Sequence, residues 1–350
     1  MEIVHDGTAL HGYMKYAVKA SPEHPILIDR FLADATEVDV DAISDGNRVV
    51  IGGIMEHIEQ AGVHSGDSAC AIPPYSLTRP VIDEILDSTR RLALEIGVCG
   101  LMNVQYAVKG GDVYVLEVNP RASRTIPFVS KAIGRPLAKL AALVMTGKKL
   151  EELGFTEEIW PTHVSVKEAV FPFMKFPGAD TLLSPEMKST GEVMGIDSDF
   201  GRAYAKSQIQ AGNSLPMQGT VLVSVREEDR AAICLAVRDL AENGFRVLAT
   251  SGTAESLTDL GVEVESVPKV GDGHPDVVER IEAGDVDLVI NTVRSDPVAV
   301  RDSAAIRRSA LLRQVPYFTT AAAAGAAVGA IRALRLESIG VRSLQEIHAP

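Results

Sequence analysis

Short apolar runs alternate with helical patterns along the whole stretch from Gly219 to the alanine-rich segment near the end of the chain. The apolar runs are predicted as strands at residues 220–225, 245–250, 262–267 and 286–291 and at Tyr317, and the helical patterns fall at residues 227–243, 254–260, 276–281 and 299–313. Because a helix separates each strand from the next, successive strands can run the same way in one sheet. This alternation predicts a doubly wound parallel sheet, with a domain boundary near residue 213.

The first part of the chain shows a different strand pattern. Between Thr36 and Ile43, apolar residues alternate with three acidic ones, which predicts a half-buried strand with an acidic face. Its predicted hairpin partner is residues 48–54, and the polar, glycine-containing residues 55–75 are expected to form a long functional loop. Further helices are predicted at residues 8–20, 79–96 (ended by Gly97), 136–146 and 203–211, and a short strand at residues 26–29.

One predicted hairpin, residues 105–121, carries polar groups that a plain sheet would not need. A three-residue loop at Gly110, Gly111 and Asp112 would place Gln105 opposite Glu117, with Asn119 further along the same face. Three oxygen donors suit a hard cation such as Mg²⁺, and Arg121 could hold a phosphate. A two-residue Gly-Gly loop would instead place Gln105 opposite Leu116 and dissolve the cluster. A polar sheet edge that ends in an Asn-Pro turn remains the alternative.

A second polar cluster is predicted at the carboxyl ends of the parallel strands. Thr250 and Thr253 lie between a strand and a helix, where backbone N–H groups can approach an anion. Asn291 and Thr292 end another strand, and Lys269 supplies a nearby charge. These residues favour a phosphate-type ligand, although hydroxyl residues at such positions can simply cap helices.

The charge and cysteine content limit the classes of partner. A formal net charge of −13 leaves no basic surplus for a long nucleic-acid track or an anionic membrane. Cys70, Cys99 and Cys234 lack metal-type spacing, so we expect reduced thiols in a cytosolic, cytoplasmic protein. No secretory leader is visible, and the alanine-rich Thr320–Ala333 is too short to span a bilayer and is predicted as a buried helix.

Long runs of the sequence resemble the large subunit of carbamoyl-phosphate synthetase, in its C-terminal half. The resemblance is carried by GGIMEHIEQAGVHSGDSAC, GLMNVQ, EVNPRASRTIPFVSKAIG, SVKEAVFPF, STGEVMG and IRRSAL, which follow in order through the chain. It implies an α/β chain in three parts. Residues 1–150 would be the later part of an α+β ATP-grasp unit, residues 151–212 its remainder and a connector, and residues 213–350 a methylglyoxal-synthase-like allosteric domain.

The resemblance also implies a reaction, the ATP-dependent phosphorylation of carbamate to carbamoyl phosphate for arginine and pyrimidine biosynthesis. Gln105, Glu117 and Asn119 would hold Mg²⁺ or Mn²⁺, and Arg121 and Asn119 would act at the transferring phosphate. The nucleotide would lie along Leu32, Glu37, Gly62, Val63, His64, Ser65, Gln105 and Glu117. Phosphoryl transfer depends chiefly on metal neutralisation and positioning, so few acid-base groups are needed.

Two effector sites are implied in the same way. A nucleoside monophosphate would bind at Thr250, Thr253, Lys269, Asn291 and Thr292, where a departure is Arg238, a lysine in some bacterial relatives. Ornithine would bind at Glu59, Asp67, Glu168, Tyr317 and Thr319, where Phe171 replaces a leucine of those relatives.

The resemblance further implies partners: the upstream large-subunit portion and a glutamine amidotransferase small subunit. The chain would begin inside the second ATP-grasp unit, as a fragment or the product of a split gene, so we expect it to be weakly active or inactive alone. Two alternatives are a regulatory fragment that only binds a nucleotide effector, and a methylglyoxal synthase acting on dihydroxyacetone phosphate through residues 213–350.

Overall fold

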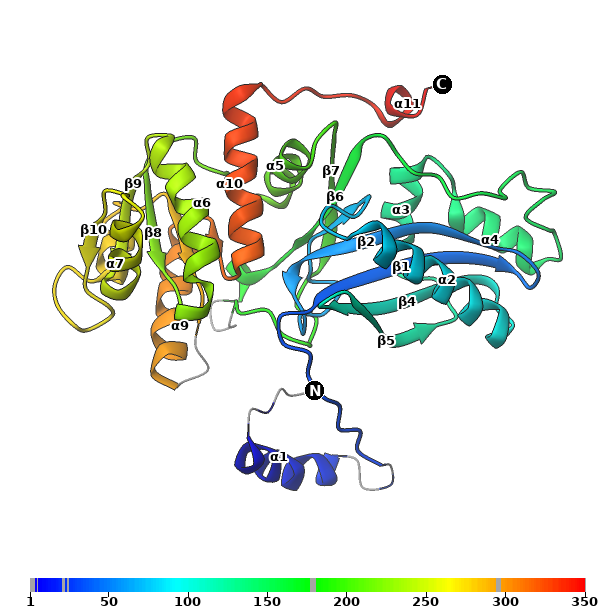
Figure 1. Cartoon of the computed structure of the whole chain (residues 1–350), viewed down its shortest axis with the longest axis horizontal. Helices are drawn as coiled ribbons and strands as arrows, with labels where there is room; N and C mark the ends of the chain where they lie inside the picture. The colour runs from blue at the N-terminus through cyan, green and yellow to red at the C-terminus, as the bar shows by residue number, and fades with distance from the viewer. Residues whose placement is uncertain are drawn as a thin grey trace.

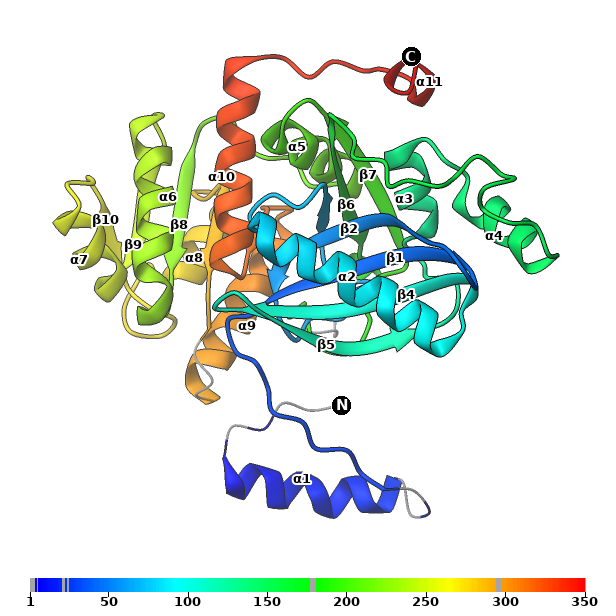
Figure 2. The same ribbon diagram turned by 45° about the vertical axis from the view of Figure 1, so that its right-hand side comes forward.

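The computed structural model describes residues 4, 6–20, 23, 25–176, 181–293 and 297–349. Two sheets form its two halves, and the helices α5 (Phe200–Ala211) and α10 (Ala321–Leu336) lie between them (Figure 1). The amino-terminal helix α1 (Gly7–Ala20) stands apart from both sheets in Figures 1 and 2, and Tyr16 on it is 73% exposed.

The first sheet is antiparallel and has the strand order β5-β4-β1-β2-β3-β6-β7. Its strands are β1 (Thr36–Asp45), β2 (Val49–Gln60), β3 (Cys70–Ile72), β4 (Cys99–Lys109), β5 (Asp112–Asn119), β6 (Val164–Val170) and β7 (Gly191–Asp197). Helix α2 (Arg79–Ile96) covers one face, and helices α3 (Ile126–Ile133) and α4 (Leu137–Met145) cover the other. Figure 2 shows α2 lying across the strands of this sheet.

Strand β1 is buried on both faces, so the expected half-buried strand is wrong. Val38, Val40 and Ala42 pack in the core that contains α2, and the acidic side chains point to the opposite face, which α3 and α4 cover. Asp39 is 3% exposed and Asp41 is 0% exposed. The acidic residues therefore lie inside the molecule, where each needs hydrogen-bond partners.

Several other boundaries differ from the sequence-based expectations. The segment 55–75 contains the end of β2 and all of β3, because its polar residues are buried and hydrogen-bonded within the sheet. The strands β6 and β7 and the helix α3 were missed, whereas the expected strand at residues 26–29 is irregular. Pro136 is the N-cap of α4, outside its first turn.

The turn between β4 and β5 has two residues, Gly110 and Gly111, so the predicted three-residue loop is wrong. Next to this turn Lys109 pairs with Asp112, a register that would place Gln105 opposite Leu116 if it continued. A bulge in β5 shifts the register between Gln105 and Tyr106, and Gln105 pairs with Glu117 after all. The predicted pairing is confirmed, and the bulge is its cause.

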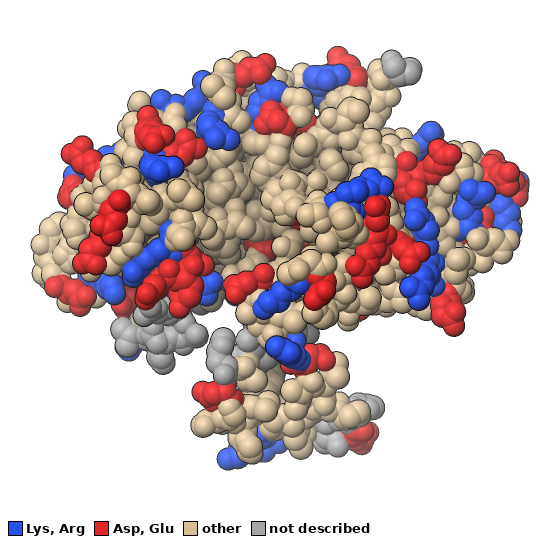
Figure 3. Space-filling model, viewed as in Figure 1, with Lys and Arg blue, Asp and Glu red and all other residues tan. Residues whose placement is uncertain are grey.

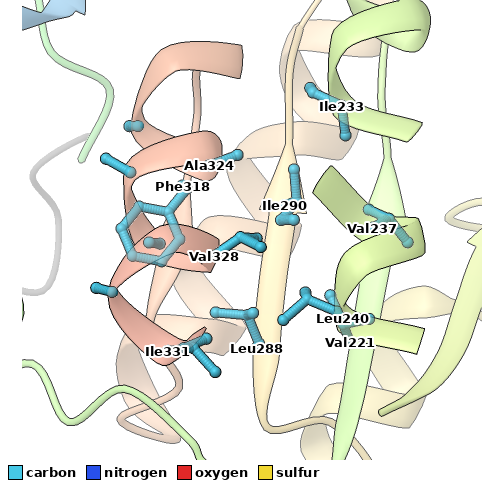
Figure 4. Packing of buried hydrophobic residues seen from close by; sticks show 14 of the residues in the cluster. Val221, Ile233, Val237, Leu240, Leu288, Ile290, Phe318, Ala324, Val328 and Ile331 are labelled. Carbon is cyan, nitrogen blue, oxygen red and sulfur yellow. The ribbon is translucent and has the colours of Figure 1, made fainter. Parts of the chain in front are cut away.

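The second sheet is parallel with the strand order β10-β9-β8-β11-β12, which confirms the predicted doubly wound arrangement. The strands are β8 (Thr220–Ser224), β9 (Arg246–Thr250), β10 (Glu265–Val267), β11 (Leu288–Asn291) and β12 (Tyr317–Phe318). Its helices are η2 (Glu227–Asp229), α6 (Arg230–Glu242), α7 (Ser251–Asp259), α8 (Val277–Glu282) and α9 (Pro297–Leu312). Figure 4 shows α6 and α10 packed side by side on one face; α8 and α9 pack on the other.

Small residues let α5 and α10 pack closely, and one apolar cluster runs from the first sheet through both helices into the second. A Cβ on Gly201 would lie 2.9 Å from the Gly329 carbonyl oxygen and 3.0 Å from the Ala333 Cβ. The alanine-rich segment is thus a buried helix, as predicted. The two sheets share a core and are not joined by a free linker.

The carboxyl-terminal segment returns to the first half of the molecule, where α11 (Leu344–Ile347) lies near α3 (Figure 1). The His348 ring Nε2 lies 2.6 Å from the Lys131 carbonyl oxygen, and the ring meets His163 edge-on at 5.5 Å. The ring fills the space beside Gly134, which ends α3 with φ +68°. This contact ties the end of the chain to the helix that follows the hairpin loop.

Candidate active site and effector pockets

Three of the predicted oxygen donors meet at the β4–β5 edge of the first sheet, and we call Gln105, Glu117 and Asn119 the triad. Gln105 and Glu117 are direct cross-strand partners, and the Asn119 side-chain amide donates to Glu117 Oε1 at 2.7 Å. That bond leaves an oxygen of Glu117 and the amide oxygen of Asn119 available. The donors are one carboxylate and two amides, a set of hard oxygen ligands that fits Mg²⁺. Among the described residues there is no group of three or more His, Cys, Asp or Glu that could hold a metal ion.

The loop after β2 reaches the triad through Ser65. The Gln105 side-chain amide donates to Ser65 Oγ at 3.1 Å, and Glu37 Oε1 accepts the Gly62 N–H at 2.9 Å. The His64 ring Nδ1 accepts the Gly66 N–H at 3.0 Å, which tightens the turn. Burial raises the pKa of Glu37, opposed by the nearby His57.

Separate hydrogen bonds thus hold this loop at Glu37 through Gly62 and at the triad through Ser65. Val63 lies between them on the same loop. Leu32 lies in the turn before β1, half-buried, where its carbonyl accepts the Ala35 N–H at 3.3 Å.

A cavity of about 230 Å³ opens beside the triad. Gln105, Glu117 and Arg121 line it, together with Lys167, whose side chain is 1% exposed and whose Nζ donates to the Ser65 carbonyl at 3.2 Å. Lys167 was not singled out from the sequence, and nothing in its local pattern separates it from an ordinary strand lysine. The lining carries three carboxylates (Asp39, Glu117 and Glu192), two amides (Asn103 and Gln105) and three cationic side chains (Arg121, Arg124 and Lys167). Asn119 is not in the lining and is joined to it by its hydrogen bond to Glu117.

A buried carboxylate beneath this cavity was also missed. Asp41 accepts hydrogen bonds from Asn103 Nδ2 at 3.0 Å, Ser123 Oγ at 2.7 Å and Thr125 Oγ1 at 2.6 Å. Burial raises its pKa to about 6, and the three hydrogen bonds oppose that rise. The acidic alternation along β1 was the available signal, but it was assigned to a solvent face.

The second predicted cluster lines one pocket of about 540 Å³ at the carboxyl ends of β8, β9 and β11. Its lining includes every nucleotide-effector residue that the sequence suggested: Thr250, Thr253, Lys269, Asn291 and Thr292. The chain reverses its strand order between β8 and β11, and such switch points are common binding crevices. The Asn291 Oδ1 is buried without a partner among the described residues, while its Nδ2 donates to the Ser224 carbonyl at 3.0 Å.

The capping alternative does not account for Thr250. It is the N-cap residue of α7, yet its side chain makes no capping bond, and its Oγ1 donates to Ser224 Oγ at 3.3 Å. The first N–H groups of α7 therefore face the pocket without a side-chain acceptor from their own cap.

Arg238 does not belong to this pocket, so that assignment was wrong. It lies on α6 with its side chain 46% exposed, 3.8 Å from Glu242. Arg230, at the start of the same helix, lines the pocket instead, and its buried Nε has no partner among the described residues. A Cβ on Gly252 would lie 2.7 Å from the Arg230 guanidinium, so the glycine makes room for this side chain.

A third pocket, of about 490 Å³, contains most of the predicted ornithine residues. Glu59, Glu168, Tyr317, Thr319 and Phe171 line it. Burial raises the pKa of Glu59 and of Glu168, and the Glu168 charge raises that of Glu59 further. Asp67 is not with them. It is 0% exposed and accepts the backbone N–H groups of Lys188 at 2.8 Å and Ser189 at 2.9 Å, which makes it a loop anchor.

A larger cavity, of about 940 Å³, was not anticipated. It is bounded by the small residues of α10, the start of α5 and the ends of β1 and β2. Figure 3 shows a mostly tan hollow between α10 and the first sheet, with some acidic atoms inside it and charged side chains around it. Among the described residues, no helix is long and apolar enough to cross a membrane.

Comparisons with known proteins agree with the sequence motifs. Residues 1–153 match the family model of the carbamoyl-phosphate synthase L chain, ATP binding domain, and residues 232–319 match the MGS-like domain. The carbamoyl phosphate synthase large chain of Nostoc sp. is 55% identical over 352 residues, which cover 99% of this chain and 32% of that protein. That of Methanothermobacter thermautotrophicus is 56% identical over 351 residues, with 99% and 33% covered. The chain thus spans about a third of the length of these relatives.

One solved structure, the biotin carboxylase domain of a single-chain bacterial carboxylase, has a TM-score of 0.42 and 17% identity over 60% of this chain and 62% of that one. The sequence matches, and not this looser likeness, confirm the resemblance drawn from the motifs.

Proposed function

We propose that the chain belongs to the family of carbamoyl-phosphate synthase large chains, and that its first sheet forms part of an ATP- and Mg²⁺-dependent site that phosphorylates carbamate to carbamoyl phosphate. The observation that carries this proposal is the triad. Its carboxylate and two amides are joined by strand pairing and a hydrogen bond, and Gln105 and Glu117 line one cavity together with Arg121 and Lys167. A strand edge with no ligand would not need this donor set.

Each part of the site has a separate task in this proposal. Glu117, Gln105 and Asn119 hold the cation, and Mg²⁺ supplies charge neutralisation between the nucleotide phosphates when bound. Arg121 contacts the transferring phosphoryl group, whose charge grows in the transition state. Leu32, Glu37 and the loop residues Gly62, Val63, His64 and Ser65 lie along the nucleotide. The hydrogen bond from Gln105 to Ser65 joins the nucleotide loop to the triad.

A further part of a synthetase is proposed to cover this site. Strand β5 is at the edge of the sheet, and its Tyr114, Val115 and Leu116 are 41%, 49% and 48% exposed. Exposed apolar side chains beside a polar cleft are typical of a contact surface. The proposed partners are the upstream large-subunit portion and a glutamine amidotransferase small subunit.

The test is ATP formation from carbamoyl phosphate and Mg·ADP. We expect little ATP from the chain alone and substantial ATP when it is mixed with the remainder of the large chain from the same genome. Manganese should replace magnesium in the mixture. Absence of ATP formation in a mixture that assembles would contradict the proposal and leave the regulatory reading.

The pocket of the second sheet is proposed to bind a nucleoside monophosphate effector. Arg230, Lys269 and the free N-terminus of α7 supply positive potential for a phosphate, and Asn291 and Thr292 offer hydrogen bonds to the rest of the ligand. We also propose that residues 1–150, 151–212 and 213–350 serve as catalytic, connecting and regulatory parts. Binding of a nucleotide without any effect on the assembled synthetase would favour a separate sensor.

The third pocket is proposed to bind a cationic amino acid, with ornithine as the ligand. Burial raises the pKa values of Glu59 and Glu168 there, and a cation beside them would stabilise their charged forms. A carboxyl whose native pKa is raised destabilises the fold as the pH climbs from its ordinary value through the native one. We expect Glu59→Gln to unfold about 2–4 °C higher than the wild type at pH 9, with no difference at pH 5. Thermal unfolding by circular dichroism measures this.

Glutamine still accepts the Ala69 N–H, which Glu59 Oε2 meets at 2.5 Å, so the variant should fold. Ornithine should raise the melting temperature of the wild type and not that of the variant, and the exposed Glu157→Gln should behave as wild type in both assays. An equal shift at pH 5 and pH 9 would show that the Glu59 charge is not the cause.

A further inference from the structure

The loop between β5 and α3, residues 120–125, carries Arg121 and has few anchors of its own. Its backbone makes a tight turn in which the Arg121 N–H donates to the Asn119 carbonyl at 2.8 Å, and the exposed Arg121 side chain donates only to the neighbouring Ala122 carbonyl, at 3.2 Å. The segment is otherwise irregular. Local hydrogen bonding therefore does not fix where this loop lies relative to the triad.

Asp41 supplies the anchor from the opposite side of the cleft. It is 0% exposed on β1, and its carboxylate accepts both hydroxyl groups of the loop, Ser123 Oγ at 2.7 Å and Thr125 Oγ1 at 2.6 Å. The two hydroxyl oxygens are also 2.8 Å apart, which closes the cluster. Thr125 is the N-cap residue of α3, yet its side chain makes no capping bond to that helix. The hydroxyl that would ordinarily cap a helix is directed to Asp41 instead.

The third partner of Asp41 reaches the other arm of the hairpin. Asn103 Nδ2 donates to Asp41 Oδ1 at 3.0 Å, and Asn103 is the cross-strand partner of Asn119. One carboxylate thus holds both strand β4, at the residue paired with Asn119, and the loop that follows Asn119 in the chain.

The buried charge of Asp41 lowers the stability of the folded protein. Burial raises the pKa of Asp41 to about 6, with the charge of Asp39 adding to the rise, so a charged Asp41 at neutral pH opposes folding. A neutral side chain of the same size would fill the space with a smaller loss of folding free energy.

We propose that Asp41 is a positioning residue, which sets the distance between Arg121 and the triad by holding Asn103, Ser123 and Thr125 on one carboxylate. The inference rests on the proposed function only for its catalytic consequence, since the loop anchoring itself belongs to this chain alone. Asp41 is 0% exposed, does not line the cavity and is not among the residues proposed to hold the nucleotide or the metal.

The test is Asp41→Asn, which keeps the size of the side chain and removes its charge. In the isolated chain, we expect faster hydrogen exchange at the amides of residues 121–125, since Pro120 has none, and a melting temperature at pH 8 equal to or above that of the wild type. In the reconstituted assembly, we expect kcat for ATP formation from carbamoyl phosphate and Mg·ADP to fall about 10- to 100-fold, with KM for Mg·ADP changed less than about 3-fold.

The matched control is Asp45→Asn on the same strand. Asp45 accepts backbone N–H groups of Asn47, Arg48 and Leu150, and these bonds lower its pKa, so its loss should reduce stability and leave exchange of the 120–125 loop and kcat unchanged. If Asp41→Asn loses stability in the same way with unchanged kcat and loop exchange, the positioning role is refuted. Should Asp41→Asn fold poorly, Ser123→Ala tests the same contact from the loop side. This variant must increase the rate of amide hydrogen exchange in the loop.

Failure of the proposed function gives a different result. The wild-type assembly would then form no ATP, while the exchange of residues 120–125 would still respond to Asp41→Asn and not to Asp45→Asn.

Discussion

Replacing Glu117 by alanine is expected to lower ATP formation from carbamoyl phosphate and Mg·ADP in the reconstituted synthetase by at least about 10³-fold. Glu117 is the only charged donor of the triad, and its carboxylate also orients the Asn119 amide through the 2.7 Å hydrogen bond. In the proposed site, its loss would remove one metal ligand and leave the Asn119 amide without its hydrogen-bond partner. Glu117 is exposed on an edge strand, so the variant should fold and keep the melting temperature of the wild type.

The control for this prediction is Asp112→Ala. Asp112 is an exposed carboxylate on the same strand, next to the turn and away from the triad, and its loss should leave the rate unchanged. A second readout is the concentration of Mg²⁺ that gives half-maximal rate, which should rise for any residual activity of the Glu117 variant. Near-normal turnover at ordinary Mg²⁺ concentrations would contradict the metal assignment.

The structure shows which features a single sequence can predict here. The parallel sheet was predictable because each short apolar run is followed by a segment of helical periodicity, so the local pattern and the overall fold agree. The same agreement placed Thr250, Asn291 and Lys269 around one pocket, since the carboxyl ends of parallel strands lie along one edge.

The triad was predicted for a reason that turned out to be wrong. Glycines at 110 and 111 favour a two-residue turn, which the structure has, and that turn alone would have paired Gln105 with Leu116. The bulge in β5 corrects the register, and no composition signal announces it because it falls in an apolar run. Pairing across a hairpin therefore depends on the bulge as much as on the turn.

Buried acidic residues were the other source of error. Alternation of acidic and apolar residues along β1 has the same period whether the polar face meets water or a hydrogen-bonded interior. Asp41 and Asp39 became interior only because α3 and α4, which lie far along the chain, cover that face. Arg230 was missed for a similar reason. The sequence alone does not show which arginine of α6 lies beside the pocket, because that depends on how the helix packs against the sheet.

Arg230→Ala is expected to weaken binding of nucleoside monophosphates to the isolated chain by about 30-fold or more, which corresponds to about 2 kcal/mol for a charge-assisted contact to phosphate. Arg230 is partly buried against Gly252, at the N-terminus of α7, and its Nε has no partner among the described residues. A partly buried guanidinium whose Nε has no partner among the described residues should gain more from a phosphate than an exposed one. Titration calorimetry with a panel of purine and pyrimidine monophosphates, and with inorganic phosphate, measures the change.

Arg238→Ala is the matched control, because Arg238 lies on the same helix with its side chain exposed and directed to Glu242. The charge removed is identical, so a general electrostatic attraction to the pocket would weaken both variants alike and would weaken them less in high salt. A direct phosphate contact instead predicts loss for Arg230 alone, for inorganic phosphate as well as for the nucleotides. Equal affinities of Arg230→Ala and the wild type for these ligands would contradict a phosphate contact at the start of α6. They would indicate that the phosphate binds nearer Lys269, on the other wall of the pocket.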